Sequence, residues 1–256
     1  MASHAVYQFY AELDDYTPKI WRRFQVSANI TVARLGYILM TLFEMKASHL
    51  FAFELPMADN FHERIQSRYP SRKMREIPDE FRASLKIYRY EIPNDESFAE
   101  QNDDYVVFDA TTHKISRITK DSGTRLNFNY DFGDDWWISL TLENVFFDKE
   151  LNAKELPRVL EGAGYGIIED CGGVSGLEEL TKAFKKKKGR EYNEYSKWLG
   201  IGDLDMSAFD INDMDFRLKK VPRIYTDIYE HHIGPTKQSI DLLERKYLQK
   251  KANAEK

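Results

Sequence analysis

The chain has 256 residues, which is enough for one large domain or two small ones. Its 42% of hydrophobic residues, including many aromatic ones, predict a folded protein with a real core and not a disordered one. The 37 basic residues nearly balance the 42 acidic ones, so the net charge of −5 gives no overall attraction to nucleic acid or to a membrane surface.

The cysteine content and the hydropathy of the chain indicate the compartment in which the protein is expected. Cys171 is the only cysteine, so no internal disulfide can form, and this suits a reducing compartment. The first residues lack the basic and apolar regions of a signal peptide. No stretch approaches the roughly 18 apolar residues that a membrane span needs. We therefore expect a cytoplasmic protein with no membrane partner.

The N-terminal part of the chain alternates between strand and helix patterns. Residues 5–13 place apolar and polar side chains on opposite faces, which predicts a half-buried strand. Residues 20–26 predict its hairpin partner, after turn-forming residues at 14–18. Thr31 is placed to cap a helix whose apolar residues recur at helical spacing. Residues 49–55 predict a third strand, with His49 on its apolar face.

The rest of the chain mixes strand signals with short helices. Residues 56–104 show no regular pattern and are interrupted by four prolines. Strand signals return at 105–109 and 115–119. Short helices are expected in the C-terminal third, over residues 177–187, 191–199, 207–218 and 236–248.

The clearest prediction is an antiparallel hairpin. Residues 125–132 and 136–143 both alternate, on either side of a short loop that contains Gly133. In a structural interpretation, Gly133 supplies a positive φ in the turn and Trp136 anchors the loop in the core. The neighbouring carboxylates then accept backbone N–H groups of the turn; they are Asp131, Asp134 and Asp135.

A functional interpretation of the same carboxylates stays open beside the structural one. Acid–base or hydrolytic work would use Asp131, Asp134, Asp135, Glu169 and Asp170. A divalent metal ion would be held by oxygen ligands and one histidine, from His49, Asp131, Asp135 and Glu169. His49 is equally compatible with a structural role in the core or at a sheet edge. Cys171 lies among acidic residues, which disfavour a thiolate and hence a nucleophilic role.

The strongest positive run lies near residue 186 and also has two interpretations. Lysines at the end of a helix complement its dipole and are usually solvated. Alternatively, they contact the phosphates of a nucleic acid, with Tyr192, Tyr195 and Trp198 stacking on bases and not packing on the domain. The residues concerned are Lys182, Lys185, Lys186, Lys187, Lys188 and Arg190.

Five motifs in order along the chain resemble the plasmid pRiA4b ORF-3-like family. They span most of residues 5–218, while the last residues form an extension. The chain departs from the family pattern at Met45, where a tryptophan is usual, and at Ile167-Ile168, where two prolines are usual. The motifs are Pro18–Phe24, Ser48–Phe53, Tyr130–Trp136, Glu169–Gly173, and Trp198–Gly200 with Phe209-Asp210.

The resemblance implies an α+β fold and an association with plasmids and transposable elements, without an established activity. We therefore expect an antiparallel sheet with packed helices in one domain over residues 1–218, followed by a helical C-terminal extension over 219–256. The expected function is an accessory or interaction protein of a mobile element, whose partner is a protein or nucleic acid of that element. The sequence shows no complete catalytic set, and it implies no cofactor beyond the divalent metal considered above.

Overall fold

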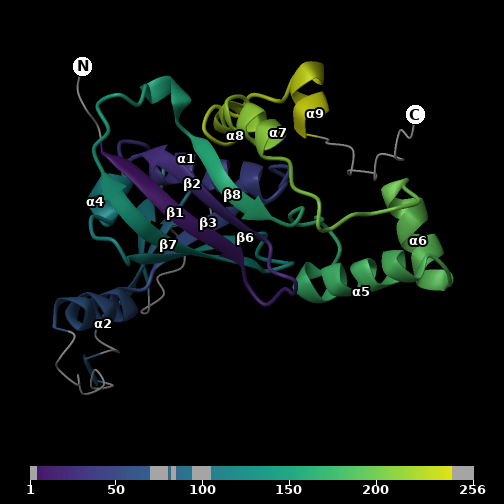
Figure 1. The fold of residues 1–256 in the computed structure, drawn as a ribbon, viewed down its shortest axis with the longest axis horizontal. Helices are drawn as coiled ribbons and strands as arrows, with labels where there is room; N and C mark the ends of the chain where they lie inside the picture. The colour runs from purple at the N-terminus through teal and green to yellow at the C-terminus, as the bar shows by residue number, and fades with distance from the viewer. Residues whose placement is uncertain (1–4, 70–79, 82–84, 94–104, 244–256) are drawn as a thin grey trace.

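The computed structural model describes residues 5–69, 80–81, 85–93 and 105–243, and within them one eight-stranded sheet forms the centre of the protein (Figure 1). The strands are β1 (Val6–Leu13), β2 (Trp21–Ser27), β3 (Phe51–Leu55), β4 (Ile87–Glu91), β5 (Tyr105–Asp109), β6 (Arg125–Tyr130), β7 (Trp136–Phe146) and β8 (Arg158–Ala163). Their order across the sheet is β5-β4-β3-β6-β7-β1-β2-β8. All neighbours are antiparallel except β4 and β5, which run parallel. The expected α+β class is confirmed.

Helices pack on this sheet and extend beyond it. They are α1 (Val32–Leu42), α2 (Met57–Arg68), α4 (Ile115–Ile118), α5 (Gly173–Lys186), α6 (Arg190–Leu199), α7 (Ile211–Leu218), α8 (Val221–Tyr229) and α9 (Lys237–Leu243), with a short 3₁₀ turn at Ala153–Glu155. Figure 1 shows α5 and α6 projecting to one side, while α2 lies at the opposite end of the molecule. None of the helices in the described ranges is both long and apolar enough to cross a bilayer.

The central helix is α1, which is buried along almost its whole length. It contacts β3, α7 and α8, and every one of its residues except Arg34 is buried. Thr31 caps it as expected, because its hydroxyl oxygen accepts a hydrogen bond from the backbone N–H of Arg34 at 3.1 Å. Gly36 allows the close approach of the Phe51 ring from β3, which a side chain at this position would meet.

Three buried ionic side chains connect elements of the fold. Arg22 of β2 has no solvent exposure, and its guanidinium donates to five backbone carbonyls in β2, the end of α1 and the segment after β8. Glu44, just after α1, forms a buried ion pair with Arg217 of α7 at 2.8 Å. Pairing and hydrogen bonding of this kind are what make a buried charge tolerable.

The structure corrects several sequence-based boundaries. Residues 115–119, expected as a strand, begin with the helix α4; Ile115 and Ile118 are three residues apart, a helical spacing that a strand would place on opposite faces. The irregular 56–104 stretch contains α2 and β4. The third strand begins at Phe51, so His49 precedes it. The 207–218 helix begins at Ile211, where the Asp210 carboxylate caps it.

The C-terminal part contains a helix that the sequence patterns did not predict. Helix α8 packs against α1, and it buries Val221, Pro222 and Tyr225. The helix expected over 236–248 is present as α9 up to Leu243, and its remainder lies outside the described residues. The residues after 218 thus contribute directly to the core around α1.

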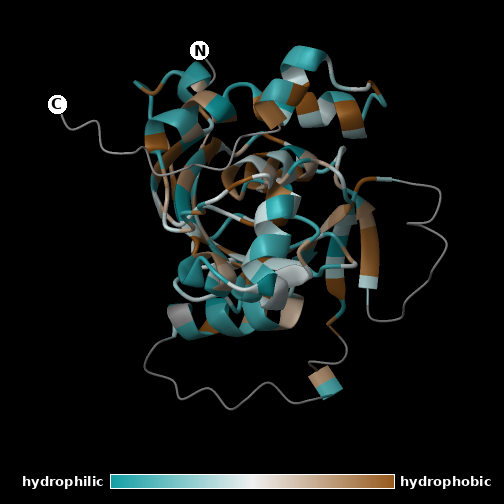
Figure 2. Ribbon diagram, turned by 90° about the vertical axis from the view of Figure 1, so that its right-hand side faces the viewer, coloured by the Kyte–Doolittle hydropathy of each residue, from teal (hydrophilic) through white to brown (hydrophobic). Residues whose placement is uncertain are grey.

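Figure 2 views the molecule after a quarter turn and shows the β5 edge of the sheet in hydrophobic colours. By contrast, α2 is drawn mainly in hydrophilic colours. Phe108 of β5 faces Tyr88 and Tyr90 of β4, with ring centroids 5.3 and 5.2 Å apart. This edge therefore has an aromatic layer of its own beside α2.

Candidate functional site

The turn between β6 and β7 is longer than the sequence suggested, and its glycine has a different role. The strand ends at Tyr130, and the positive φ angles belong to Asp131 (57°) and Asp135 (54°), not to Gly133. Aspartate tolerates this conformation because its carboxylate can bond the local backbone. The Asp131 carboxylate accepts the N–H of Gly133 at 3.1 Å and of Asp134 at 3.4 Å. The prediction that this aspartate serves its own turn is confirmed, whereas the role given to Gly133 is wrong.

Glu169 is buried and is the most fully bonded carboxylate of the predicted site. It accepts the backbone N–H of Lys46 at 2.7 Å, the Ser48 hydroxyl at 2.7 Å and the Tyr130 hydroxyl at 2.5 Å. These donors come from the segment after α1 and from the end of β6. Glu169 therefore joins three parts of the chain that are distant in sequence.

The β6–β7 turn and the loop before α5 lie against each other. The Asp134 carboxylate accepts the N–H of Gly172 at 3.2 Å. A side chain at Gly173 would collide with the Asp134 carbonyl oxygen, so the two backbones are in direct contact here. We call this region, comprising Asp131, Asp134, Asp135, Glu169 and Asp170 with His49, the acidic junction.

His49 occupies the partly exposed side of the acidic junction. Its Nε2 atom lies 3.4 Å from Asp131 Oδ2 and 3.5 Å from Asp170 Oδ1, although neither contact is aligned as a hydrogen bond. The imidazole also meets the Tyr130 ring edge-on at 5.8 Å. The structure thus brings this histidine to two of the predicted carboxylates.

Three tyrosines close the acidic junction from the protein interior. The hydroxyls of Tyr225 and Tyr229 in α8 donate to the backbone carbonyls of Met45 and His49. Burial, followed by the charge of Glu169, raises the pKa of Tyr130 well above its ordinary value, and burial likewise raises the pKa of Tyr225 and Tyr229. These phenols therefore remain neutral hydrogen-bond donors throughout the physiological range.

The predicted metal ligands do not all meet at one point. Asp135 accepts the side-chain amide of Asn129 at 2.8 Å, and Glu169 is turned towards Lys46, Ser48 and Tyr130. Within the described ranges, no three His, Cys, Asp or Glu side chains are grouped as a metal site. His49 remains close to two of the predicted carboxylates, with its Nε2 atom between the buried Asp131 and the exposed Asp170.

Cys171 lies between the two loops of the acidic junction. Burial raises the pKa of its thiol to about 12, and the neighbouring charge of Asp134 contributes in the same direction. A thiol of this kind is almost entirely protonated near neutrality, so it is a poor nucleophile. The direction agrees with the effect expected from the acidic neighbours in the sequence.

The basic run lies at the far end of α5 and the start of α6, away from the acidic junction (Figure 1). Half of its cations are paired: Lys182 with Glu178 at 2.9 Å, Lys187 with Asp203 at 3.1 Å and Arg190 with Glu194 at 2.7 Å. The others are exposed and have no ion pair within the described part of the chain; these are Lys185, Lys186 and Lys188.

The aromatic residues beside the basic run are divided between packing and exposure. Tyr192 meets the ring of Phe184 at 5.6 Å and donates its hydroxyl to the Gly202 carbonyl. Trp198 is about half exposed, at 48%. Tyr192 therefore has a structural role, whereas Trp198 presents an aromatic surface.

Comparisons with known proteins place this architecture in a family. The profile of the family described as plasmid pRiA4b ORF-3-like protein matches residues 5–217. The chain belongs to the plasmid pRiA4b ORF-3-like family. A relative in Sinorhizobium fredii (strain NBRC 101917 / NGR234), the uncharacterized protein y4hQ, is 24% identical over 204 residues, which cover 79% of this chain and 85% of that protein.

The fold of this pRiA4b ORF-3-like protein also has a counterpart among solved structures. The crystal structure of MM3350, a protein of unknown function from Methanosarcina mazei Go1, is similar with a TM-score of 0.60 and 26% sequence identity. The similarity covers 83% of this chain and 98% of that one. Both relatives are described without a function, so the comparisons add family and fold but no activity.

The motifs of this pRiA4b ORF-3-like protein have clear structural roles. Arg22, in the first motif, binds five backbone carbonyls, and Glu169, in the fourth, joins three segments. Asp210, in the last, caps α7 through the backbone N–H groups of Asn212 and Asp213. Each of these polar residues is used to connect or terminate elements of the fold.

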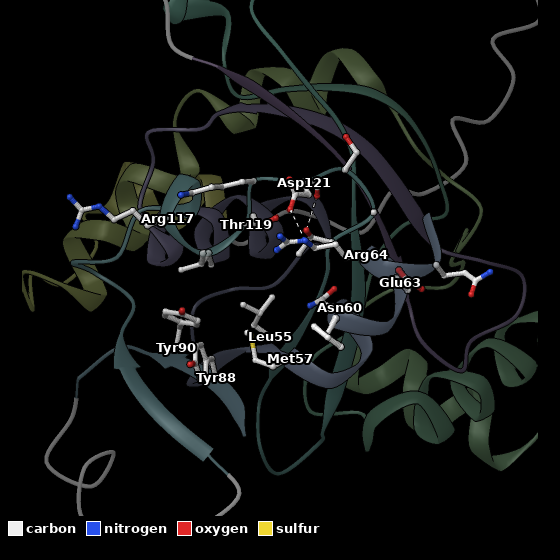
Figure 3. Close-up of a pocket in the computed structure, with 17 residues that line it drawn as sticks. Leu55, Met57, Asn60, Glu63, Arg64, Tyr88, Tyr90, Arg117, Thr119 and Asp121 are labelled. Carbon is white, nitrogen blue, oxygen red and sulfur yellow. Dashed lines mark hydrogen bonds and ion pairs between the residues drawn. The ribbon is translucent and has the colours of Figure 1, made fainter. Parts of the chain in front are cut away.

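One feature of the surface was not expected from the sequence. A cavity of about 780 Å³ lies between α2, β4 and the segment around residues 117–124 (Figure 3). Its lining comes from three separate stretches, residues 55–66, 88–90 and 117–124, and the first two lie almost entirely in the region that showed no regular pattern. The alternation of Tyr88 and Tyr90 was the available signal, because residues two apart in a strand share a face.

Proposed function

We propose that the protein is an accessory binding protein of a plasmid or transposon-type mobile element, and that its acidic junction is a structural joint and not a reaction centre. The link to a mobile element is supported by the family, which is named after an open reading frame of a plasmid. The comparisons give no activity or partner, so the binding role is our own inference. It is based on the junction, whose chemistry is that of a structural joint and not of a reaction centre.

The observation that carries this proposal is the hydrogen bonding of Glu169. A catalytic carboxylate needs an oxygen that can reach substrate or water. Glu169 is buried, and its two oxygens accept three hydrogen bonds from Lys46, Ser48 and Tyr130. Its bonding capacity is therefore used to hold the chain together.

A second candidate, a metal-dependent hydrolase or nuclease, is favoured by one specific contact. His49 lies within 3.5 Å of both Asp131 and Asp170, and the Asp170 side chain is 70% exposed. A histidine beside two carboxylates can hold a proton or serve as a metal ligand. A nucleic-acid-binding role has less support, because half of the cations in the basic run already face acidic partners.

Unfolding of a Glu169→Gln variant distinguishes the structural joint from a reaction centre. The substitution keeps the shape of the side chain but removes the charge that three donors share. We expect the free energy of unfolding to fall by about 2 kcal/mol, as measured in urea. Asp170→Asn is the matched control. Its side chain is mostly exposed, so its effect should stay within about 0.5 kcal/mol.

Metal titration supplies the other arm of the same experiment. A divalent ion bound with a Kd of about 10 µM would stabilise the wild type by about 2.7 kcal/mol at about 1 mM. Under the proposed function, Mg²⁺, Mn²⁺ and Zn²⁺ should leave the unfolding midpoint unchanged. The rival function is supported instead if Glu169→Gln is as stable as the wild type, and if metal stabilises the wild type but not His49→Ala.

The mobile-element part of the proposal is tested with the neighbouring genes. The full chain is co-expressed with the products of adjacent open reading frames, and the mixture is separated by size-exclusion chromatography. We expect one neighbouring product to co-elute at a defined stoichiometry. Elution of the protein alone, together with turnover of a phosphodiester or ester substrate by the pure protein, would contradict the accessory role.

A further inference from the structure

The cavity beneath α2 is within the size range of small-molecule sites. Its volume of about 780 Å³ falls in the range of 300–1,000 Å³ that is typical of ligand pockets. It is separate from the acidic junction, since neither loop of the junction contributes to its lining. Figure 3 shows Tyr88 and Tyr90 on one side of the cavity and Arg64 with Asp121 across from them.

The apolar wall of the cavity is largely aromatic and is supported from behind. Tyr88 and Tyr90 lie on the same face of β4, and both pack on the Phe108 ring of β5. Leu55 and Phe61 complete this wall from β3 and α2. Aromatic faces stack on flat apolar molecules, and their support by a second strand reduces the entropy that a ligand would cost them.

The helical wall of the cavity is fixed to the sheet. The side-chain amide of Asn60 both donates to and accepts from the backbone of Arg125 in β6, at 2.9 and 2.7 Å. Glu63, one turn of helix away, forms an ion pair with the Arg125 side chain at 2.5 Å. Helix α2 is therefore held over the cavity by Asn60 and Glu63, which also belong to the lining of the cavity.

Positive charge is concentrated at the rim. Arg64, Arg117 and Lys120 line the cavity, against two acidic residues, Glu63 and Asp121. Glu63 already faces Arg125, and the Arg64–Asp121 pair is long, at 3.8 Å, with both side chains largely exposed. An exposed pair of this length is weak. The three cations outnumber the two carboxylates of the lining, so the rim carries a net positive charge that attracts an anion.

The tyrosine hydroxyls add polar groups to an otherwise apolar wall. No hydrogen-bond partner for Tyr88 or Tyr90 lies in the described part of the chain, and burial raises the pKa of Tyr90 to about 12. The Tyr90 phenol is therefore a neutral donor near pH 7. An apolar wall with a few convergent polar groups is the usual composition of a small-molecule site.

We propose that this cavity binds a small aromatic organic acid, with its ring against Tyr88 and Tyr90 and its anionic group beside Arg64. The proposal extends the proposed binding function by giving it a ligand, but it rests on different residues. Its test is chosen accordingly, because loss of ligand binding here would leave the unfolding of Glu169→Gln unaffected.

The experiment measures binding of naphthoate and of anilinonaphthalene sulfonate to the full chain, by calorimetry and fluorescence. We expect saturable binding of one molecule per chain, competition between the two ligands and a higher unfolding midpoint in their presence. The neutral analogue naphthalenemethanol should bind more weakly than naphthoate, because it lacks the charge that Arg64 recognises.

Two arginines on the same helix provide the matched variants. Arg64→Gln should weaken naphthoate binding roughly tenfold, since it removes a charge-assisted contact, and should leave naphthalenemethanol binding unchanged. Arg68→Gln, at an exposed position of α2 outside the lining, should change neither affinity. Met57→Trp should fill the cavity and prevent binding of both ligands. If Met57→Trp does not unfold cooperatively, Tyr88→Ala is measured in its place.

The proposal is overturned by either of two results. One is the absence of saturable, one-to-one binding by wild-type protein that unfolds cooperatively. The other is an equal loss of naphthoate affinity in Arg64→Gln and Arg68→Gln, which would show that the ligand responds to overall charge and not to this cavity.

Discussion

The acidic junction and the cavity beneath α2 use their polar groups in opposite ways. At the junction, Glu169 accepts three hydrogen bonds and Asp134 binds the backbone of the opposing loop. Around the cavity, the Arg64–Asp121 pair is long and exposed, and Tyr88 lines the opposite side. The junction has the richer collection of reactive residue types, but most of its bonding capacity is already used.

The difference shows that residue type alone does not locate a site. A carboxylate that is buried and saturated stabilises the fold, because removal of one partner would leave a buried polar group unsatisfied. A rim whose cations outnumber its carboxylates attracts an anion. In this protein the residues suited to binding are therefore the less conspicuous ones.

Alanine substitution at two adjacent glycines tests how tightly the junction is closed. Gly172 and Gly173 both have positive φ, so alanine at either position costs roughly 1–2 kcal/mol in backbone strain. Only Gly173 faces the Asp134 carbonyl. We expect Gly173→Ala to lose about 1–3 kcal/mol more than Gly172→Ala in urea unfolding, because the two loops must separate. Equal losses would mean that the loops are not packed together, and the contrast with the open cavity would disappear.

The alkylation rate of Cys171 tests the electrostatics of the junction, and its expected change is smaller than the losses of stability described above. Burial and the charge of Asp134 raise the pKa of the thiol to about 12, so it should stay protonated at pH 8 and react slowly with iodoacetamide. The rate should rise about tenfold for each pH unit between pH 7 and 9, while the thiolate remains a minor species.

Substitution of Asp134 by asparagine should lower the pKa of Cys171 and speed its alkylation. Since the chain has one cysteine, the mass increase reports on this position alone, and glutathione under the same conditions is the reference. Alkylation of the native protein at the glutathione rate would show that the thiol is neither buried nor adjacent to a charge, and would contradict a closed junction.

Much of the fold could be predicted from local sequence patterns. The alternation in 5–13, 20–26 and 125–132 identified strands of the central sheet, and Thr31 marked the start of α1. Where local patterns were ambiguous, the prediction failed. At 115–119 an alternating strand would place Ile115 and Ile118 on opposite faces, whereas their three-residue spacing suits the helix α4.

The sequence predicted which residues belong to the candidate site, but not which hydrogen bonds they form. The sequence brought together Asp131, Glu169 and His49 through motifs, and the structure places all three at one junction. It could not show that Glu169 is turned towards Lys46, Ser48 and Tyr130, because those contacts depend on the relative placement of α1, β6 and the loop before α5. The cavity was missed for the same reason, since its lining is assembled from segments that are distant in sequence.

A double-mutant cycle between Tyr130 and Glu169 tests the central claim most directly. The free energies of unfolding of the wild type, Tyr130→Phe, Glu169→Gln and the double variant are measured in urea under one set of conditions. If Glu169 is a structural joint, Tyr130→Phe removes this hydrogen bond and Glu169→Gln removes the charge that strengthens it, so a coupling energy of about 1–1.5 kcal/mol should result. Additive effects within about 0.5 kcal/mol, or a Glu169→Gln variant more stable than the wild type, would contradict the account.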